Sequence, residues 1–479
     1  MVVVTSAHVL HIGKTLVVWA FLVRPLHWRA SRLPFCVSSI RGTLPFDVAA
    51  LFERYGPVVR IAPNELAYVE AQAWRDICGH SPKTEENGKF TEFYRPGKGM
   101  PQDIISADKK THTVIRRQLS HGFGDRAIRD QEPIIRGYVD LLMDRLHEHG
   151  QEGHHALDMT AWYNYTTFDV IGDLAFGDSF GCLQEASMHY WVKTFFKLTE
   201  LSVWMQSAIH YPLIKDLLIN SIPKSFMKVL DDNAEFAHRK VSKRIELGAS
   251  RNDLIEGLLM KQDDWQMPRQ DIDSHAGLLI VAGSETTATL LSGATYLLAS
   301  HPEALAKLTR EVRSAFTSED QITVASAGQL TYMLACLDEA FRMYPPVPTG
   351  LPRIVAPGGR MICGEFMPGG THVGVWQWAA NHYSANWAKP FEYHPERWID
   401  GQNAEFAADQ REAMQPFSYG PRNCIGRNLA YAEMRTIIAR LVFAFDLKLA
   451  PEGENWLRGQ KVFNLWRKPP LWVHLVPRA

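Results

Sequence analysis

Apolar residues recur at helical spacing along most of the chain after about residue 111. Segments 132–149 and 166–177 carry apolar residues at the spacing typical of helices packed on a core. A longer helix is predicted from about Asp271 to Ser300, and an apolar helix from Leu429 to Leu447 near the C-terminus. The pattern therefore predicts a mainly α protein.

A smaller part of the chain has the pattern of strands and tight turns. Residues 45–75 predict short strands separated by turns, and the region after Pro345 is rich in proline, glycine and β-branched residues. Because these segments are distant in sequence, they predict a minor β region assembled from separate parts of the chain. Length alone suggests about three domains, but no linker divides the chain, and we expect one large domain over residues 35–479.

The segment from Asp273 to Ser300 is long enough to suggest a membrane span, but Glu285 lies at its middle, between Ser284 and Thr286. An ionisable group at that depth in a bilayer costs several kcal/mol. We therefore predict a helix buried in a soluble core. Such a helix keeps a carboxylate only where that carboxylate is used or paired.

The N-terminus has an apolar run over residues 15–23, followed by the cationic residues Arg24, Arg29 and Arg32. The run is shorter than the about 20 apolar residues of a spanning helix. The cationic flank is typical of an anchor whose following domain faces the cytosol. We expect a weak membrane anchor over residues 1–34, the alternative being a frayed N-terminus.

Charge and cysteine content exclude several classes of protein. The chain has 51 Lys and Arg against 52 Asp and Glu, so it lacks the basic surface of a nucleic-acid binder. Six cysteines are scattered without a CxxC pair, which excludes a zinc-type spacing and a dense disulfide framework. We expect free thiols in a reducing compartment.

The stretch FSYGPRNCIG, residues 417–426, surrounds Cys424 with glycine, proline and arginine. Gly420 allows a turn with positive φ, and Gly426 lets the backbone approach a large flat group. Backbone N–H groups and the neighbouring Arg422 favour a thiolate, which serves as a nucleophile or a metal ligand. No His/Asn partner for a nucleophile is evident, whereas a haem iron needs one sulfur alone. The plain alternative is an inert buried thiol.

This loop resembles the haem-binding loop of the cytochrome P450 family, Phe-x-x-Gly-x-Arg-x-Cys-x-Gly, with Phe417, Gly420, Arg422, Cys424 and Gly426 at its fixed positions. The resemblance implies the P450 fold, in which haem b lies buried between a long central helix and the cysteine loop. It also implies that Cys424 is the axial ligand of the iron and that the other four residues bind the cofactor. The likeness runs from about residue 40 to the C-terminus, without the family's proline-rich hinge.

Two further motifs of the family follow in the expected order. EAFR, with Glu339 and Arg342 on one helix face, and the later Arg397 resemble a buried structural Glu–Arg–Arg cluster. AGSETT, residues 282–287, resembles the oxygen-activation signature. That likeness implies that Gly283 and its neighbours open a groove above the iron. It also implies two catalytic residues: Thr286, which hydrogen-bonds the iron-bound oxygen, and Glu285, which supplies protons towards it. The alternative is a group of hydroxyls bonded to the carbonyls of their own helix.

The family also needs cations for the two haem propionates. His112 and Arg116 lie at i and i+4 on one helix face and resemble the propionate-binding helix, with His112 where tryptophan is common. Arg353 and Arg422 occupy the other positions that match the family's propionate-binding residues. Arginine suits this task because charge-assisted pairs are the strong hydrogen bonds of a buried site. Arg117 is expected to be a solvated neighbour.

The resemblance implies a haem-thiolate monooxygenase that inserts one oxygen atom of O₂ into an apolar small molecule. The nearest group is the fungal isotrichodermin-hydroxylase-like members of secondary metabolism, so we expect a polyketide or terpenoid substrate. Expected pocket segments are 95–107, Val281–Ala282, Val347–Gly350 and Gln460–Asn464. Since no nucleotide-binding fingerprint is evident, we expect electrons from NADPH–cytochrome P450 reductase, with cytochrome b5 as a second donor.

We also expect a monomer at the endoplasmic reticulum membrane, with its catalytic domain in the cytosol and no nucleic-acid partner. One alternative is a haem-thiolate isomerase, dehydratase or peroxygenase that uses no reductase, although such enzymes tend to lose the pair formed here by Glu285 and Thr286. A haem carrier or sensor and a cysteine-nucleophile hydrolase are two further alternatives.

Overall fold

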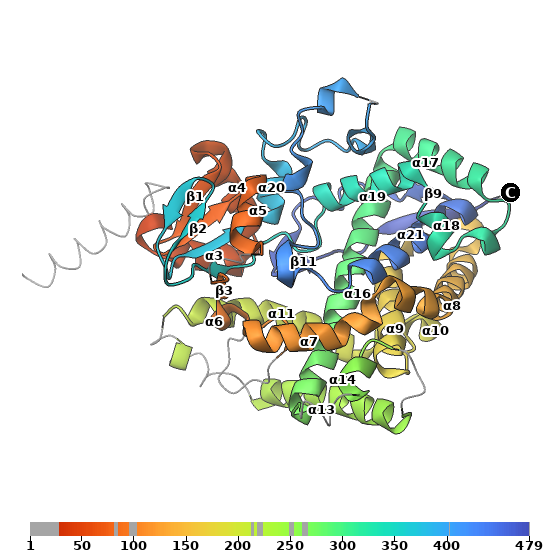
Figure 1. The fold of residues 1–479 in the computed structure, drawn as a ribbon. Helices are drawn as coiled ribbons and strands as arrows, with labels where there is room; N and C mark the ends of the chain where they lie inside the picture. Colours follow the sequence, from red (N-terminus) through yellow and green to blue (C-terminus); the bar gives the residue numbers. More distant parts are fainter. Residues whose placement is uncertain are drawn as a thin grey trace, which may run out of the picture.

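The computed structural model describes residues 28–80, 85–94, 103–211, 215–217, 224–248, 253–260, 267–401 and 403–478. Helices make up most of it, and the strands form small sheets, as the sequence pattern predicts. Figure 1 shows the strand-rich part, with β1 and β2, on one side of the molecule and the larger helical part on the other.

Helices on the N-terminal side of the long central helix are α3 (Leu33–Arg41), α4 (Leu44–Tyr55), α5 (Ala71–Cys78), α6 (Thr91–Tyr94), α7 (Lys109–Phe123), α8 (Asp125–Gly150), α9 (Met159–Phe176), α10 (Cys182–Glu185), α11 (Tyr190–Ala208), α13 (Lys224–Glu246) and α14 (Glu256–Met260). The central helix and those after it are α16 (Arg269–Ser300), α17 (Pro302–Ala315), α18 (Val324–Ala327), α19 (Thr331–Met343), α20 (Gln377–His382) and α21 (Arg427–Ala444).

The largest sheet has five strands in the order β1 (Val58–Ala62), β2 (Glu65–Tyr68), β8 (His372–Val375), β5 (Arg353–Ile354) and β3 (Gly88–Lys89). Its β2–β8 pair is parallel and its other pairs are antiparallel. A second sheet has the order β4 (Leu157–Asp158), β12 (Trp472–Pro477) and β9 (Phe445–Leu449). Two hairpins complete the described strands: β6 (Arg360–Ile362) with β7 (Glu365–Met367), and β10 (Lys461–Phe463) with β11 (Leu465–Arg467).

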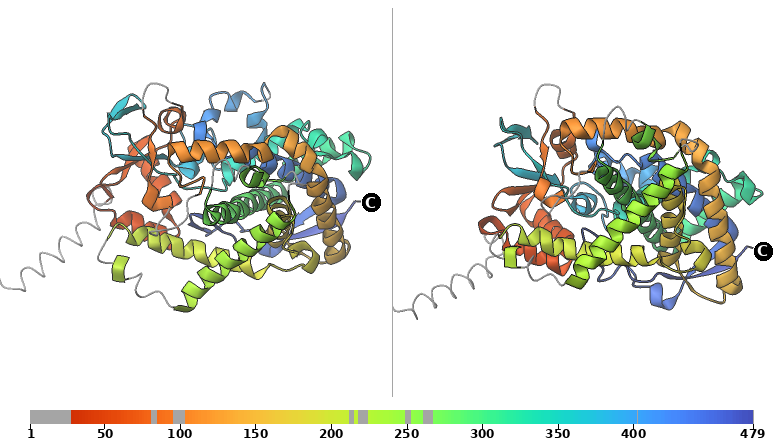
Figure 2. Two further views of the ribbon diagram at one scale, coloured as in Figure 1. Left: turned by 60° about the horizontal axis from the view of Figure 1, so that its bottom comes forward. Right: turned by 90° about the horizontal axis from the view of Figure 1, so that it is seen from below.

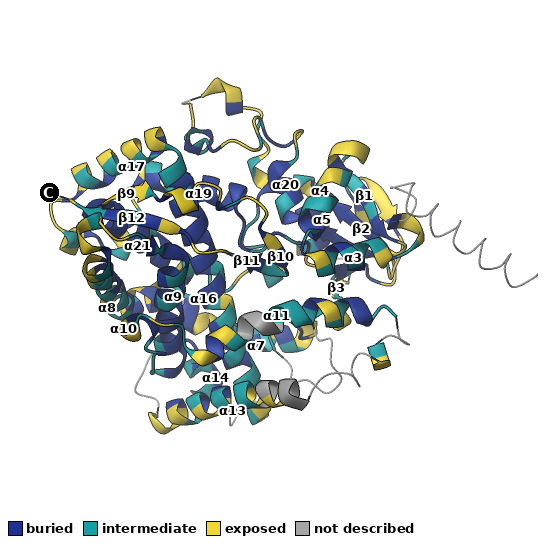
Figure 3. Ribbon diagram, turned by 180° about the vertical axis from the view of Figure 1, so that it is seen from behind, coloured by how far each residue is buried: buried dark blue, intermediate teal, exposed yellow. Residues whose placement is uncertain are grey.

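Helix α16 is the centre of the main core. It is continuous over 32 residues, and from Ser284 to Leu298 it is almost entirely buried against α9, α19 and α21. Figure 2 shows α16 enclosed by the other helices, and Figure 3 shows α9 and α16 as largely buried elements, with exposed residues on α8, α13 and α17. The prediction of a buried helix, with Glu285 inside it, is confirmed.

A second apolar cluster lies under the five-stranded sheet, where α4 and α5 cover β1, β2 and β8. Trp28 belongs to this cluster and Arg32 is buried beside it, so the folded part of the chain extends at least to Trp28. Residues 1–27 and most of the expected anchor lie outside the described residues. Within the described residues, no helix is long and apolar enough to cross a membrane.

Two local expectations were wrong. Residues 44–55 form helix α4 rather than a strand, because Pro45 can occupy the first turn of a helix and the apolar side chains Leu44, Val48 and Phe52 share one buried face. The last apolar helix ends at Ala444, and Phe445 begins strand β9, which pairs with β12. In both cases the sheet and its covering helix, which a local pattern cannot show, decide the conformation.

Candidate active site

The cysteine loop is a tight turn that leads into α21. Gly420 has φ of 75°, and a Cβ there would lie 2.1 Å from the carbonyl oxygen of Cys78. Glycine is therefore required at this position by both backbone conformation and space. The loop closes with a hydrogen bond from the Cys424 N–H to the Phe417 carbonyl at 2.8 Å. The Phe417 ring packs edge-on against Phe341 of α19, with ring centroids 5.2 Å apart.

All six cysteines are free thiols, as predicted, and among them Cys424 is the exposed one. Protein atoms nevertheless surround its thiol on the other sides, and this desolvation raises the pKa of Cys424. The backbone N–H of Gly426 and the positive charges of Arg116 and Arg427 oppose that rise. A nearby metal ion would remove the proton, because a coordinating thiol is deprotonated outright.

The expectation that Arg422 stabilises the thiolate was wrong. The Arg422 side chain turns away from Cys424, and its Nε donates to Glu86 Oε1 at 2.5 Å while its Nη1 donates to the Ala107 carbonyl at 2.8 Å. Arg116 of α7 takes the place beside the cysteine. It donates from Nη1 to the Asn423 carbonyl and from Nη2 to Asn423 Oδ1, both at 2.6 Å.

Cationic side chains gather beside the loop. Lys89 pairs with Arg353 across the β3–β5 ladder, and both line a small pocket together with Arg422. Glu86 is the carboxylate that serves this group: it bonds Arg422 and lies 3.7 Å from Arg353 Nη1. Burial and the charges of Arg353 and Arg422 lower the pKa of Lys89 well below its usual value.

His112 lies on α7 close to the same cations and is buried. Burial, followed by the charges of Arg422, Arg116 and the other cations of this group, lowers the pKa of His112 to about 3. At neutral pH its ring is therefore uncharged, with one N–H donor. Arg117, one residue after Arg116, is exposed as expected.

The residues present fit a haem with two propionates. Arg353 Nη1 is buried and has no hydrogen-bond partner among the described residues, and a buried donor without an acceptor is costly. Glu86 ion-pairs with both Arg353 and Arg422, and a propionate carboxylate would supply the acceptor that Arg353 Nη1 lacks. The exposed thiol of Cys424 lies at the loop beside these groups, and Gly426 leaves space there, because its nearest contacts to an added Cβ would be 3.7 Å or longer.

The oxygen-activation motif lies in the middle of α16. Thr286 is half-buried, and its hydroxyl donates to the Ala282 carbonyl one turn earlier at 2.7 Å. Ala282 is exposed, so this face of the helix borders open space rather than packed side chains. Gly283 lies against α9, where an added Cβ would be 2.6 Å from Ile171 Cδ1. This glycine therefore allows close packing of the two helices, and the open space lies at its neighbour Ala282.

Glu285 has a buried cationic partner. Lys468, which follows strand β11, forms an ion pair with Glu285 Oε1, and Thr289 Oγ1 donates to the same oxygen at 3.2 Å. Burial raises the pKa of Glu285, and the positive charge of Lys468 opposes the rise. The sequence motif identifies Glu285, but no sequence signal marks Lys468.

The structure brings Glu339, Arg342 and Arg397 together, all three fully buried. Arg342 donates to both oxygens of Glu339 at 2.9 and 2.7 Å, and Arg397 Nε donates to Glu339 Oε1 at 3.0 Å. Asp409 and Trp398, which the motif did not include, complete the network: Asp409 pairs with Arg397, and Trp398 Nε1 donates to Glu339 Oε2 at 2.9 Å.

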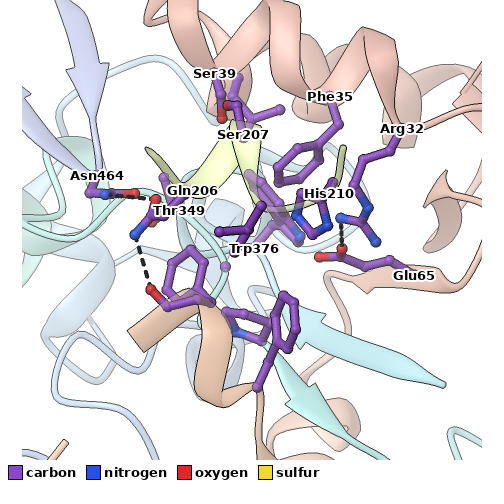
Figure 4. Close-up of a pocket in the computed structure, with 16 residues that line it drawn as sticks. Arg32, Phe35, Ser39, Glu65, Gln206, Ser207, His210, Thr349, Trp376 and Asn464 are labelled. Carbon is purple, nitrogen blue, oxygen red and sulfur yellow. Dashed lines mark hydrogen bonds and ion pairs between the residues drawn. The ribbon is translucent and has the colours of Figure 1, made fainter. Parts of the chain in front are cut away.

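A second pocket lies between α3, the large sheet, α6 and the C-terminal end of α11 (Figure 4). Thr349, Gly350 and Asn464 line it, so two of the expected pocket segments contribute. Of the expected segment 95–107, residues 95–102 lie outside the described residues. The expected residues Val281 and Ala282 are not among the residues that line this pocket.

Figure 4 shows the two polar pairs of this pocket on opposite sides. Arg32 Nη1 donates to Glu65 Oε2 at 2.5 Å, and Asn464 Nδ2 donates to Gln206 Oε1 at 3.0 Å. The remaining lining is largely aromatic or apolar, and it includes the side chains Phe35, Phe90, Phe93 and Trp376.

Comparison with known proteins decides the family. The family model described as cytochrome P450 matches residues 31–474. The chain belongs to the cytochrome P450 family. The P450 is 46% identical over 462 residues to cytochrome P450 monooxygenase tpeC of Talaromyces stipitatus, covering 95% of this chain and 89% of that protein.

Two further relatives carry names of hydroxylases. Averantin hydroxylase of Dothistroma septosporum is 44% identical over 460 residues, covering 95% of this P450 and 86% of the relative. Trichothecene C-15 hydroxylase of Fusarium sporotrichioides is 42% identical over 433 residues, covering 90% and 87%. The P450 is a haem-thiolate monooxygenase of the fungal secondary-metabolism type, which uses O₂, a small-molecule substrate and a redox partner. This overturns the hydrolase and the non-catalytic carrier as alternatives.

Proposed function

We propose that Cys424 is the axial thiolate ligand of haem b in this P450, and that Thr286 and Glu285 deliver protons to the oxygen that the haem activates. The observation that carries the proposal is the exposed Cys424 in a loop beside clustered cations, one of which, Arg353, has a buried Nη1 with no hydrogen-bond partner in the described protein. When bound, the haem supplies the activation of dioxygen and the oxidation of the substrate.

The chain's own residues have separate tasks. His112, Arg116, Arg353 and Arg422 are proposed to hold the propionates, His112 as a neutral N–H donor and the arginines as charged donors. Lys89, which the family motif did not include, joins them because it lines the same pocket as Arg353 and Arg422. Phe417, Gly420 and Gly426 shape the loop so that the thiol of Cys424 faces the cofactor.

Thr286 and Glu285 are proposed to move protons. The Thr286 hydroxyl is oriented by the hydrogen bond that it donates to the Ala282 carbonyl, and the lone pairs of its oxygen remain free to accept a hydrogen bond from a proton donor. Glu285 directly precedes it on the helix and is fully buried. General acid catalysis of this kind contributes about 10²–10⁴-fold in rate.

Spectroscopy of a Cys424 variant tests the ligand assignment. In Cys424→Ala, the ferrous carbon monoxide complex should lose the Soret position of a thiolate-ligated haem. Cys78→Ala is the matched control, because Cys78 is a half-buried thiol near the same pocket that should not bind iron. An unchanged spectrum in Cys424→Ala would refute the assignment.

The alternative is a haem-thiolate isomerase, dehydratase or peroxygenase that takes no electrons from a reductase. The presence of both Glu285 and Thr286 favours the reductase-dependent reaction, because a proton relay is needed where dioxygen is reduced. Purified enzyme should oxidise its substrate with O₂, NADPH and NADPH–cytochrome P450 reductase, and cytochrome b5 is proposed as a second donor. Equal turnover with hydrogen peroxide alone would favour the alternative.

We propose an apolar substrate such as a polyketide or terpenoid. The pocket of Figure 4 is lined by residues of two expected pocket segments and by none of the proposed cofactor-binding residues or of α16. Its aromatic lining would suit a largely apolar molecule, and the charges of Arg32 and Glu65 neutralise one another. A substrate with a free carboxylate would find no unpaired cation among the described lining residues. Screening of a neutral aromatic and its carboxylate analogue for shifts of the haem spectrum tests this preference.

We further propose that the enzyme is a monomer at the endoplasmic reticulum membrane, held by an anchor within residues 1–34, with its catalytic domain facing the cytosol. The apolar run at residues 15–23 and the arginines after it support this proposal. Replacing Val17, Val18 and Phe21 of the full chain by aspartate should move the protein from the microsomal to the soluble fraction. An unchanged distribution would contradict the anchor.

A further inference from the structure

Lys468 and Glu285 form a buried ion pair that joins the C-terminal part of the chain to the middle of α16. The side chains are 3% and 0% exposed. Lys468 Nζ also donates to Thr289 Oγ1 at 2.7 Å, and Thr289 Oγ1 donates to Glu285 Oε1 at 3.2 Å. The three groups therefore form a closed set of hydrogen bonds around one carboxylate oxygen.

The backbone on both sides of Lys468 is fixed. Two residues before it, Trp466 donates from Nε1 to the Pro345 carbonyl at 2.8 Å and stacks on Tyr344, with ring centroids 4.4 Å apart. One residue after it, the Pro469 carbonyl accepts from Trp456 Nε1 at 2.9 Å. Lys468 is consequently a rigidly held counter-ion, unlike a surface lysine that samples many rotamers.

The two oxygens of Glu285 are not equivalent. Oε1 accepts from Lys468 and Thr289, whereas Oε2 is buried and has no hydrogen-bond partner in the protein. A buried carboxylate oxygen without a partner is costly, and water commonly satisfies such an atom. The Tyr344 hydroxyl, whose pKa burial and the charge of Glu285 raise, donates to Gln460 Oε1 at 2.5 Å instead.

We propose that Lys468 is a positioning residue for proton delivery: it holds Glu285 as a carboxylate and directs Oε2 as the single oxygen that takes up and releases a proton. In each cycle Oε2 accepts a proton from water and passes it towards the Thr286 hydroxyl, and Oε1 stays bound to Lys468. Without Lys468 a fully buried carboxyl takes a proton to become neutral and ceases to accept another. This inference rests on the relay role of Glu285 in the proposed function.

Infrared difference spectroscopy of the haem-loaded enzyme at neutral pH tests the ionisation directly. The difference between wild type and Glu285→Gln should contain no C=O stretch of a protonated carboxylic acid. The difference between Lys468→Met and Lys468→Met/Glu285→Gln should contain that band. Each control variant is compared in the same way with its own Glu285→Gln double variant. Lys468→Arg keeps the positive charge, and its difference spectrum should lack the band. Lys461→Met removes an exposed lysine at the start of β10, and its difference spectrum should lack the band as well.

A protonated band already present in wild type, or absent from Lys468→Met, overturns the inference. If Lys468→Met does not accumulate with haem, the difference spectrum between wild type and Glu285→Gln still tests the inference. A protonated Glu285 in wild type would contradict the proposed role of Lys468.

Electron use separates this inference from the proposed function. With NADPH, the reductase and O₂ as the probe, Glu285→Gln should raise the fraction of electrons recovered as hydrogen peroxide, and Lys468→Met should raise it to a similar extent while Lys461→Met leaves it unchanged. An effect of Glu285→Gln without one of Lys468→Met refutes the role of Lys468 and leaves the relay intact. No effect of Glu285→Gln refutes the relay itself, and the role of Lys468 in it.

Discussion

Arg116 of α7 holds Asn423, the residue directly before the exposed cysteine, by two hydrogen bonds of 2.6 Å, one to the backbone carbonyl and one to the side chain. Its positive charge also opposes the rise in the pKa of Cys424 that burial causes. One guanidinium therefore fixes the loop and favours the thiolate. This is a second task for a residue that the family resemblance assigns to a propionate alone.

Arg116→Ala should weaken haem binding by about tenfold or more, because hydrogen bonds to charged groups contribute about 1.5–3 kcal/mol each. Haem content after gel filtration and the carbon monoxide spectrum measure the effect. Arg117→Ala removes an exposed arginine from the same helix and should retain wild-type haem content. Equal haem content in both variants would contradict the role of Arg116.

Because of His112, the free energy of unfolding should fall as the pH is lowered. The pKa of its ring is about 3 in the folded protein against an ordinary value of 6.5, so the unfolded chain binds a proton in this window that the folded chain does not. Stability should therefore rise with pH between about 3 and 6.5, by up to about 1.4 kcal/mol per pH unit. Above pH 6.5 both states are neutral and this contribution is constant.

The comparison of His112→Phe with wild type isolates that slope. Unfolding free energies measured from pH 4.5 to 7 should depend less on pH in the variant, whatever its stability at neutral pH. His154→Phe removes an exposed histidine and should keep the wild-type slope. Parallel curves for His112→Phe and wild type would show that folding leaves the pKa of His112 unchanged, which contradicts the expected shift.

The parts of the site that the sequence predicts are those held by local geometry. The turn at Gly420 and the spacing of Glu339 and Arg342 on one helix follow from neighbouring residues, and the structure shows both. The partners that complete these groups are long-range. Lys468 is 183 residues from Glu285, and Glu86 is 336 residues from Arg422.

No local pattern distinguishes Lys468 or Glu86 from a solvated charge, because their burial follows from how distant elements pack. The same reason applies to α4, which the sequence pattern assigned to strands and turns. Its apolar face is recognisable only once the sheet of β1, β2 and β8 is placed beneath it. Arg422 shows the opposite error, since adjacency in sequence to Cys424 did not mean contact.

Glu339→Ala should destabilise the fold by roughly 3–5 kcal/mol, because it leaves the buried Arg342 without its carboxylate partner. Little haem-loaded protein should accumulate, and what does accumulate should unfold at a lower temperature. Glu303→Ala, at an exposed position of α17, is the control and should behave as wild type. Normal yield and unfolding temperature of Glu339→Ala would remove the structural role of this network.

Gly283 should be intolerant of a methyl group because of one neighbour, Ile171 of α9. An added Cβ would lie 2.6 Å from Ile171 Cδ1 and 3.0 Å from Cγ1, so Gly283→Ala should cost about 1–3 kcal/mol as overpacking. Gly277→Ala in the same helix meets nothing within 4 Å and should instead stabilise by about 0.5–1 kcal/mol, since alanine favours helix over glycine.

A double-mutant cycle tests the contact itself. Ile171→Val removes Cδ1 at a cost of about 0.5–1.5 kcal/mol in wild type, but in Gly283→Ala it also removes the closer of the two clashing contacts, so the double variant should be more stable than the sum of the single effects predicts. Additive effects would mean that the contact with Ile171 is not the reason for glycine at position 283. Because Thr286 follows Gly283 by less than one turn, a strained contact at Ile171 should also displace its hydroxyl, and Gly283→Ala should release more peroxide than Gly277→Ala.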